Sequence, residues 1–281
     1  MQTISIITPS YNQGSFIEET IKSIWSQKGN FKIEHLVMDG GSNDETVEIL
    51  KKYEKKLKQK KYPVKCKRIK FYWVSKKDKG QSHAINKGLK ISHGGILAYL
   101  NSDDVYEPGA FQKVVEVFSK EKVDLIYSNC HIINQESKKT GILRAQTFDP
   151  DSYLNSHNYI PQPTVFFTRK VYKTIGSFRN NYHYAMDYDY FIRVAKKFKL
   201  FYLKEKVLAR FRIYQDSKSV SQQQKSWREA RKITLKHGSK FFSQAFFAYY
   251  RKKLRSFFQK IGFDTEPLLI NLSKVKQKLL T

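Results

Sequence analysis

The segment Gly94–Asp104, GGILAYLNSDD, joins an apolar run to two adjacent carboxylates. Its apolar part, Ile96–Leu100, is typical of a strand that is buried on both faces of a parallel sheet. The polar residues that follow lie just beyond the carboxyl end of that strand, where such sheets bind ligands. Two adjacent buried carboxylates repel each other, and a hard divalent ion with oxygen ligands offsets their charge. Asn, Ser and Asp are also ordinary turn residues, so this segment alone leaves a metal site and a plain turn open.

Alternating strands and helices surround this segment in the first half of the chain. The alternation predicts an α/β fold whose parallel sheet has right-handed crossovers, so that the loops after the strands meet at one edge. These loops are Pro9–Gly14, Asp39–Ser42 and Asn101–Asp104. The predicted strands are Ile4–Thr8, Glu34–Asp39, Lys70–Val74 and Ile96–Leu100, and the predicted helices are Ser15–Gln27, one that starts near Asp44, Gln81–Ile91 and one that starts at Pro108.

The regular alternation of strands and helices ends at about residue 140. We predict a strand at Thr164–Thr168, a helix at Asp187–Phe198 and two helices in the basic, aromatic stretch 220–261. The chain is therefore expected to form one domain over residues 1–220 and a helical, basic C-terminal extension over residues 221–281.

A strong positive charge restricts the partners. The chain has 52 Lys and Arg against 25 Asp and Glu, a net charge of +27, which favours phosphorylated substrates, an anionic membrane surface or nucleic acid. The sequence argues against nucleic acid as a partner, because no motif that reads nucleic acid accompanies the charge. Neither a G-x-G-x-x-G fingerprint after the first strand nor a P-loop is present.

The cysteines and the N-terminus indicate the cellular compartment in which the protein is expected. The two cysteines, Cys66 and Cys130, lack the spacing of a disulfide framework or a zinc module, which indicates a reducing compartment. The N-terminus does not have the pattern of a signal peptide, and no apolar window approaches the roughly 20 residues of a membrane span. We expect a cytoplasmic protein, with peripheral membrane attachment left open. Residues 239–261 interleave Phe and Tyr with Lys and Arg, which suits either an anionic membrane interface or packing against the main domain.

Six segments in order resemble family 2 glycosyltransferases. The resemblance covers about residues 3–220 and implies the GT-A fold, a Rossmann-like, mainly parallel sheet flanked by helices. It also implies transfer from a nucleotide-sugar donor with Mn²⁺ or Mg²⁺ as cofactor. The segments are ISIITPSYNQGSFIEETIKSIWSQ, HLVMDGGSNDETVEIL, DKGQSHAINKG, ILAYLNSDDVYEPGA, IPQPTVFFTRKVY and YAMDYDYFIRVA.

The resemblance assigns roles to particular residues. Asp104 is expected to bind the metal, with Asp103 contacting both the metal and the sugar nucleotide. Asp187 falls where the family places its catalytic base, and Gln162 belongs to the acceptor side. The donor-binding residues implied by the resemblance are Thr8, Pro9, Tyr11, Asp39, Asp78, Ser102 and Asp103.

The helix predicted at Asp187–Phe198 offers a second carboxylate. Asp189 and Arg193 are spaced i,i+4, so they can simply form an ion pair, and Asp189 is expected to be structural or secondary. Asp187 is therefore the better candidate for the base.

Two positions depart from the family pattern. Tyr214 stands where relatives often have a histidine that completes the metal or diphosphate site, and a neutral phenol is the poorer ligand. His83 replaces an acid that is common in relatives, and it suits either a helix surface or a diphosphate contact.

The chemistry that the resemblance implies is inverting transfer. A divalent ion stabilises the departing diphosphate, and a carboxylate on the opposite face takes the proton of the attacking hydroxyl. UDP is the nucleotide expected first, with GDP and dTDP open, and the acceptor is expected to be a glycan or a lipid-linked molecule in polysaccharide or glycan biosynthesis. The alternative function is a non-catalytic nucleotide-sugar or polyanion-binding protein on the same scaffold.

Overall fold

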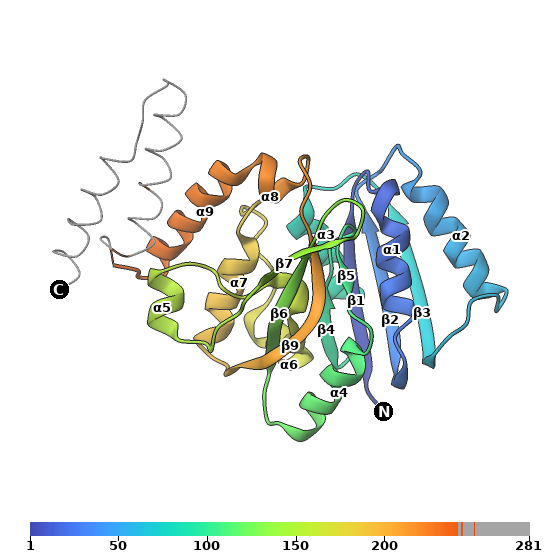
Figure 1. Cartoon of the computed structure of the whole chain (residues 1–281), viewed down its shortest axis with the longest axis horizontal. Coiled ribbons are helices and arrows are strands. Elements are labelled where there is room, and N and C mark those ends of the chain that lie inside the picture. The colour runs from blue at the N-terminus through green and yellow to red at the C-terminus, as the bar shows by residue number, and fades with distance from the viewer. Residues whose placement is uncertain (241–242, 244–249, 251–281) are drawn as a thin grey trace.

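The structure is a computed structural model that describes residues 1–240, Ser243 and Tyr250. Its sheet has nine strands in the order β3-β2-β1-β4-β8-β6-β9-β5, with β7 paired to β6 (Figure 1). The basic, aromatic segment 239–261, proposed above for a membrane interface or for packing, lies outside the described residues, except for its first two residues and for Ser243 and Tyr250.

The first half of the chain forms the parallel part of the sheet. The strand β1 pairs in parallel with β2 and β4, and β2 pairs in parallel with β3. This confirms the predicted βαβ pattern, and all eight predicted elements are present, seven of them with shifted ends and α3 at its predicted range. They are β1 (Thr3–Ser10), α1 (Gly14–Trp25), β2 (Gly29–Asp39), α2 (Thr46–Lys58), β3 (Cys66–Ser75), α3 (Gln81–Ile91), β4 (Ile96–Tyr99) and α4 (Ala110–Lys120).

The second half adds antiparallel strands, so the sheet as a whole is mixed rather than mainly parallel. The strand β8 is antiparallel to both β4 and β6, whereas β9 runs parallel to β6. The remaining elements are β5 (Val105–Tyr106), β6 (Leu125–Ile133), β7 (Lys139–Leu143), α5 (Pro150–Asn155), a 3₁₀ turn (Gln162–Thr164), β8 (Phe166–Thr168), α6 (Arg169–Ile175), α7 (Met186–Ala195), β9 (Leu200–Arg212), α8 (Lys218–Ser221) and α9 (Gln223–Lys236).

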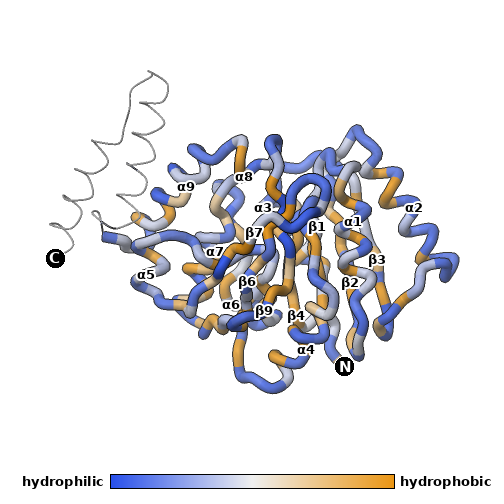
Figure 2. The backbone as a smooth tube through the Cα atoms, in the orientation of Figure 1, coloured by the Kyte–Doolittle hydropathy of each residue, from blue (hydrophilic) through white to orange (hydrophobic). Residues whose placement is uncertain are grey.

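Two apolar layers cover the two faces of the sheet. Side chains alternate along β1, so Ile4 and Ile6 pack with α1, α2 and α4, whereas Ile7 packs with α3, α6 and α7. Figure 2 shows the hydrophobic residues concentrated on the central strands. The helices α7 and α9 pack against each other at the end of the sheet opposite to α2 (Figure 1). None of the described helices combines the length and the apolar character that crossing a membrane requires.

Candidate active site

A cavity of about 1160 Å³ lies at the carboxyl ends of β1, β2 and β4. All three loops predicted to meet at this edge contribute to its wall, through Pro9, Gly40 and Asn101 among others. The starts of α3, α7 and α8, the inner side of α9, the loop after α5 and the end of β9 complete the wall. The cavity therefore lies at the sheet edge where right-handed crossovers were expected to bring these loops together.

Five of the seven predicted donor-binding residues line this cavity, and two lie beneath it. Pro9, Tyr11, Asp78, Ser102 and Asp103 contribute to the wall. Thr8 is fully buried instead, and its hydroxyl lies 3.0 Å from Nε2 of His35. Thr8 thus supports the loop from below.

Asp39 is likewise fully buried and acts on the cavity through a turn. Its carboxylate accepts hydrogen bonds from the backbone N–H groups of Gly41 and Ser42, at 3.0 and 2.9 Å, and from the hydroxyl of Ser75 at 2.6 Å. Gly41 has φ +87°, in the left-handed region that favours glycine, and it lines the cavity. The structure therefore shows Asp39 holding the Gly40–Gly41 turn in place.

The two adjacent carboxylates face different ways. Asp103 lines the cavity, whereas Asp104 is fully buried beneath the wall. Oδ1 of Asp104 accepts a hydrogen bond from the backbone N–H of Arg212 at 2.9 Å, and Nδ2 of Asn101 lies 3.3 Å from its other oxygen. Burial raises the pKa of both carboxyls, and the charge of Asp103 adds to the rise at Asp104. Asp104 thus bonds to the backbone beneath the cavity wall, and the metal contact expected of it stays a prediction.

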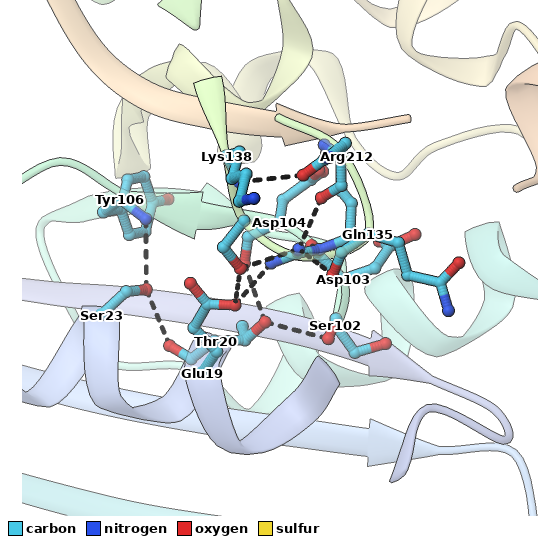
Figure 3. A network of polar contacts seen from close by, with 12 residues as sticks. Glu19, Thr20, Ser23, Ser102, Asp103, Asp104, Tyr106, Gln135, Lys138 and Arg212 are labelled. Carbon is cyan, nitrogen blue, oxygen red and sulfur yellow. Dashed lines mark hydrogen bonds and ion pairs between the residues drawn. The ribbon is translucent and has the colours of Figure 1, made fainter. Parts of the chain in front are cut away.

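The side chain of Arg212 holds the turn that carries these carboxylates (Figure 3). It is almost fully buried, at 1% exposure, and its Nε donates to the carbonyl oxygen of Asp103 at 2.8 Å. Nη2 forms an ion pair with Glu19 at 2.6 Å, and the guanidinium lies over the ring of Phe16 at 4.8 Å. Its Nη1 donates to the carbonyl oxygens of Asn134 and Gln135 and to the hydroxyl of Ser137.

Arg212 was missed from the sequence. It lies two residues before Tyr214 in the run ARFRIYQDSKS. A lone arginine at the end of a strand gives no signal of burial, since arginine is usually exposed. The pairing of β9 with β6 and β5 brings Arg212 beside the turn after β4, where its side chain is buried.

Tyr214 touches Asp103 without lining the cavity. Its hydroxyl donates to Oδ2 of Asp103 at 3.3 Å, and its ring lies 4.9 Å from that of Phe16. Burial, with the charge of Asp103, raises the pKa of Tyr214 to about 12. The phenol therefore stays protonated near neutral pH and serves as a hydrogen-bond donor to the carboxylate. His83 does not line the cavity either, and its Nδ1 accepts from the backbone N–H of Lys79 at 3.4 Å.

The residues at the end of β4 fit a metal that is shared with a substrate. Within the described part of the chain, no group of three or more His, Cys, Asp or Glu side chains is placed to hold a metal ion. Mg²⁺ is commonly bound by one or two carboxylates together with substrate phosphates and waters. Asp103 is such a carboxylate, because it lines the cavity. Burial disfavours its ionised form, and a divalent ion beside it would offset that cost.

Asp187 is the second residue of α7 and lines the same cavity. Burial raises the pKa of its carboxyl to about 6, although hydrogen bonds from backbone N–H groups and from Asn158 offset part of the rise. The pKa of Tyr99 is raised by burial and further by the charges of Asp187 and Asp104. Tyr99 therefore lies within electrostatic reach of both carboxyls, on the cavity wall.

The remaining predicted residues divide between wall and interior. Gln162 lines the cavity and donates through Nε2 to the carbonyl oxygen of Tyr99 at 2.8 Å. Asp189 is fully buried and forms ion pairs with Arg179 at 2.6 Å and with Arg193 at 2.9 Å. The i,i+4 pairing of Asp189 with Arg193 is thus present, and neither residue reaches the cavity.

Lys218 is a further cavity residue that the sequence did not single out. It begins α8, its ammonium lies 3.1 Å from Oε1 of Gln81, and it sits 5.1 Å from the ring of Tyr184. It lies at the border between the predicted domain and the extension, where no motif drew attention to it.

The matched family model defines the class of this protein. Residues 5–178 match the model described as Glycosyl transferase family 2, which is more than half of the 281-residue chain. The chain therefore belongs to this family and is a glycosyltransferase. An uncharacterized glycosyltransferase of Mycobacterium tuberculosis (strain ATCC 25618 / H37Rv) is 27% identical over 198 residues, which are 69% of this chain and 69% of that protein.

Solved structures show the same fold at low sequence identity. S. aureus TarS 1-349 in complex with UDP-GlcNAc matches with a TM-score of 0.62 and 15% identity, over 96% of this chain and 79% of that one. The mannosyltransferase PcManGT from Pyrobaculum calidifontis, in complex with GDP-Man and Mn²⁺, matches with a TM-score of 0.60 and 14% identity, over 84% and 65%. Another TarS structure matches with a TM-score of 0.59 and 17% identity, over 81% of this chain but 39% of that one. These likenesses confirm the expected GT-A fold.

Proposed function

We propose that this glycosyltransferase moves a sugar from a nucleoside-diphosphate donor to a hydroxyl group of a glycan or lipid-linked acceptor, with inversion at the anomeric carbon. One observation carries the proposal. Asp103, at the end of β4, and Asp187, at the start of α7, line one cavity large enough for a nucleotide-sugar and part of an acceptor. A donor-side carboxylate and a base are what such a transfer requires.

On the donor side, we assign the metal contact to Asp103 and a supporting role to Asp104. The placement of Asp103 in the cavity wall and the engagement of Asp104 with the backbone of Arg212 support this division. Mn²⁺ or Mg²⁺, when bound, supplies Lewis-acid stabilisation of the diphosphate that leaves. The Mn²⁺ and GDP-Man in PcManGT and the UDP-GlcNAc in TarS support donors of this kind.

On the acceptor side, Asp187 serves as general base. The acceptor oxygen bonds to the anomeric carbon while the bond from that carbon to the diphosphate oxygen breaks. The electron pair leaves with the nucleoside diphosphate, and the hydroxyl proton passes to Asp187. A pKa of about 6 keeps this carboxyl ionised at neutral pH, yet basic enough to take the proton.

Thermal-shift screening with UDP-, GDP- and dTDP-sugars, with and without Mn²⁺, tests the donor assignment. We expect one nucleotide class to raise the melting temperature, and Mn²⁺ to enlarge the shift, because a ligand that binds only the folded state stabilises it. UDP-sugars are the first candidates. If no donor shifts the melting temperature, the proposal is contradicted in favour of a nucleotide-independent or polyanion-binding role.

The proposal includes an acceptor that is bound to a membrane, because the chain is strongly basic. A net charge of +27 favours attachment to anionic lipid, where a lipid-linked acceptor would be found. Sedimentation of the full chain with vesicles of anionic or neutral phospholipid tests this part separately. Equal binding to both kinds of vesicle, or to neither, would contradict electrostatic attachment.

A further inference from the structure

A carboxylate of α9 holds the backbone that leads into α7. Oε1 of Glu229 accepts hydrogen bonds from the backbone N–H groups of Tyr184 and Ala185, each at 2.7 Å, and Oε2 accepts one from His183 at 2.9 Å. Three consecutive N–H groups thus converge on one side chain from a distant part of the sequence. Glu229 lies beyond the residues that match the family model.

This contact occurs where α7 lacks a cap of its own. The N-cap residue is Ala185, whose methyl side chain accepts no hydrogen bond, and the helix starts with Met186 and Asp187. N–H groups at the start of a helix need acceptors, which the N-cap side chain usually supplies. Glu229 supplies an acceptor to the residues just before the helix, and its negative charge suits the positive end of the helix dipole.

We propose that Glu229 is a positioning residue that orients Asp187 in the cavity from outside the family-matched segment. The inference rests on the proposed role of Asp187 as the base. Residues 183–185 determine where α7 begins, and the carboxyl of Asp187 lies two residues further on. An error of about 1 Å in the position of a reacting group can lower a rate by on the order of 10²-fold, so the backbone ahead of the base matters to turnover.

A second contact keeps α9 in register with α7. Nε2 of His237, just after α9, lies 3.0 Å from Oδ1 of the buried Asp189. Glu229 in the middle of α9 and His237 just after its end thus both contact the α7 region, so α9 supports the helix that carries the proposed base.

The negative charge of Glu229 also affects the pKa of Asp187. Burial is the main cause of the raised pKa of Asp187, and the negative charge of Glu229 adds to it. The other titratable groups around Asp187 are Tyr99 of β4, Tyr153 of α5, His157 of the loop that follows, and Lys218 of α8. Removing the charge of Glu229 should therefore lower the pKa of Asp187 while these groups stay in place.

The test compares Glu229→Ala, Glu229→Gln and Asp187→Asn in the full chain, with Glu121→Gln as a matched control at an exposed position remote from the cavity. Release of nucleoside diphosphate from the nucleotide-sugar found by thermal shift is measured across the pH range. We expect Glu229→Ala to lower kcat by on the order of 10²-fold, with KM for the donor changed less than about twofold. Glu229→Gln should recover part of kcat, since its amide oxygen still accepts from Tyr184 and Ala185.

The pH profile separates positioning from general stability. In Glu229→Gln, the acid limb of kcat/KM should move to lower pH, a result that stands even if Glu229→Ala fails to fold. Wild-type kcat in Glu229→Ala, or an unmoved acid limb in Glu229→Gln, would overturn the inference. Wild-type turnover in Asp187→Asn would instead overturn the proposed base, so the two failures are distinguishable.

Discussion

The carboxylate of Asp104 accepts a hydrogen bond from the backbone N–H of Arg212 at 2.9 Å, which joins the turn after β4 to the end of β9. The side chain of Arg212 returns to the same turn through the carbonyl oxygen of Asp103. This reciprocal contact buries one carboxylate and leaves its neighbour at the cavity. The pair therefore divides into a buried member and a cavity-facing member.

We predict that substitutions of the two aspartates separate binding from folding. Asp103→Asn should keep the wild-type melting temperature but lose the effect of Mn²⁺ on donor binding, by about tenfold or more in Kd. Asp104→Ala should lower the free energy of unfolding by about 1–3 kcal/mol, because the buried N–H of Arg212 loses its acceptor. Calorimetric titration and urea unfolding measure the two effects. The opposite pattern, with Mn²⁺ dependence lost in Asp104→Asn and kept in Asp103→Asn, would return the metal contact to Asp104.

Arg212→Met should be strongly destabilising. It removes a buried guanidinium, leaves Glu19 without its partner and exposes several carbonyl oxygens to an apolar side chain. Breaking a buried ion pair by removing one partner costs about 3–5 kcal/mol, here discounted toward the lower value because Glu19 is partly exposed. Urea unfolding measures the loss, with the exposed Arg144→Met as the matched control. Equal stability of the two variants would show that the network does not hold the turn.

Activity should depend on the ionisation of Asp187. A protonated carboxyl cannot take the proton of the acceptor, so kcat/KM should fall about tenfold for each pH unit below the pKa of about 6. The pH profile of donor consumption at saturating metal measures this. An acid limb that persists near pH 6 in Asp187→Asn would assign that ionisation to another group.

The ionised carboxylate of Asp187 should lower the free energy of unfolding. Its pKa rises from an ordinary 3.8 to about 6 on folding, so folding favours the protonated form. The stability of the wild type relative to Asp187→Asn should therefore fall as pH rises from about 4 to 6 and stay lower above that range. Because the side chain is only partly buried, we expect Asp187→Asn to be about 1–2 kcal/mol more stable at neutral pH. Urea unfolding at acidic and neutral pH measures this difference, and a variant less stable than the wild type at neutral pH would contradict the raised pKa.

The first half of the fold could be predicted because its signals are local. Helix α3 was predicted at Gln81–Ile91, its observed range, since apolar periodicity and flanking glycine mark both ends. The long strand β9, Leu200–Arg212, was not predicted, because its residues alternate weakly and its pairing with β6 joins segments far apart in the sequence. Its placement decides which carboxylate is buried.

The candidate site also has residues that could be predicted from local sequence signals and residues that could not. The positions of Asp103 and Asp187 at the cavity could be predicted, because a strand end and a family-like segment mark them. That Asp104 turns inward could not be found, since two adjacent residues on a turn face directions set by the backbone and by β9. Glu229 was missed because it lies in a helix without any motif, in the region predicted as an extension beyond residue 220. Its role depends on the packing of α9 against α7.

Donor turnover by Asp187→Asn tests the central claim most directly, once the donor is known from the thermal-shift screen. The proposed mechanism predicts that kcat falls by about 10²- to 10⁴-fold, the contribution typical of a general base, while Kd for the donor stays within about twofold of wild type. A kcat within about tenfold of wild type, with the donor still bound, would contradict the assignment of Asp187 as the base.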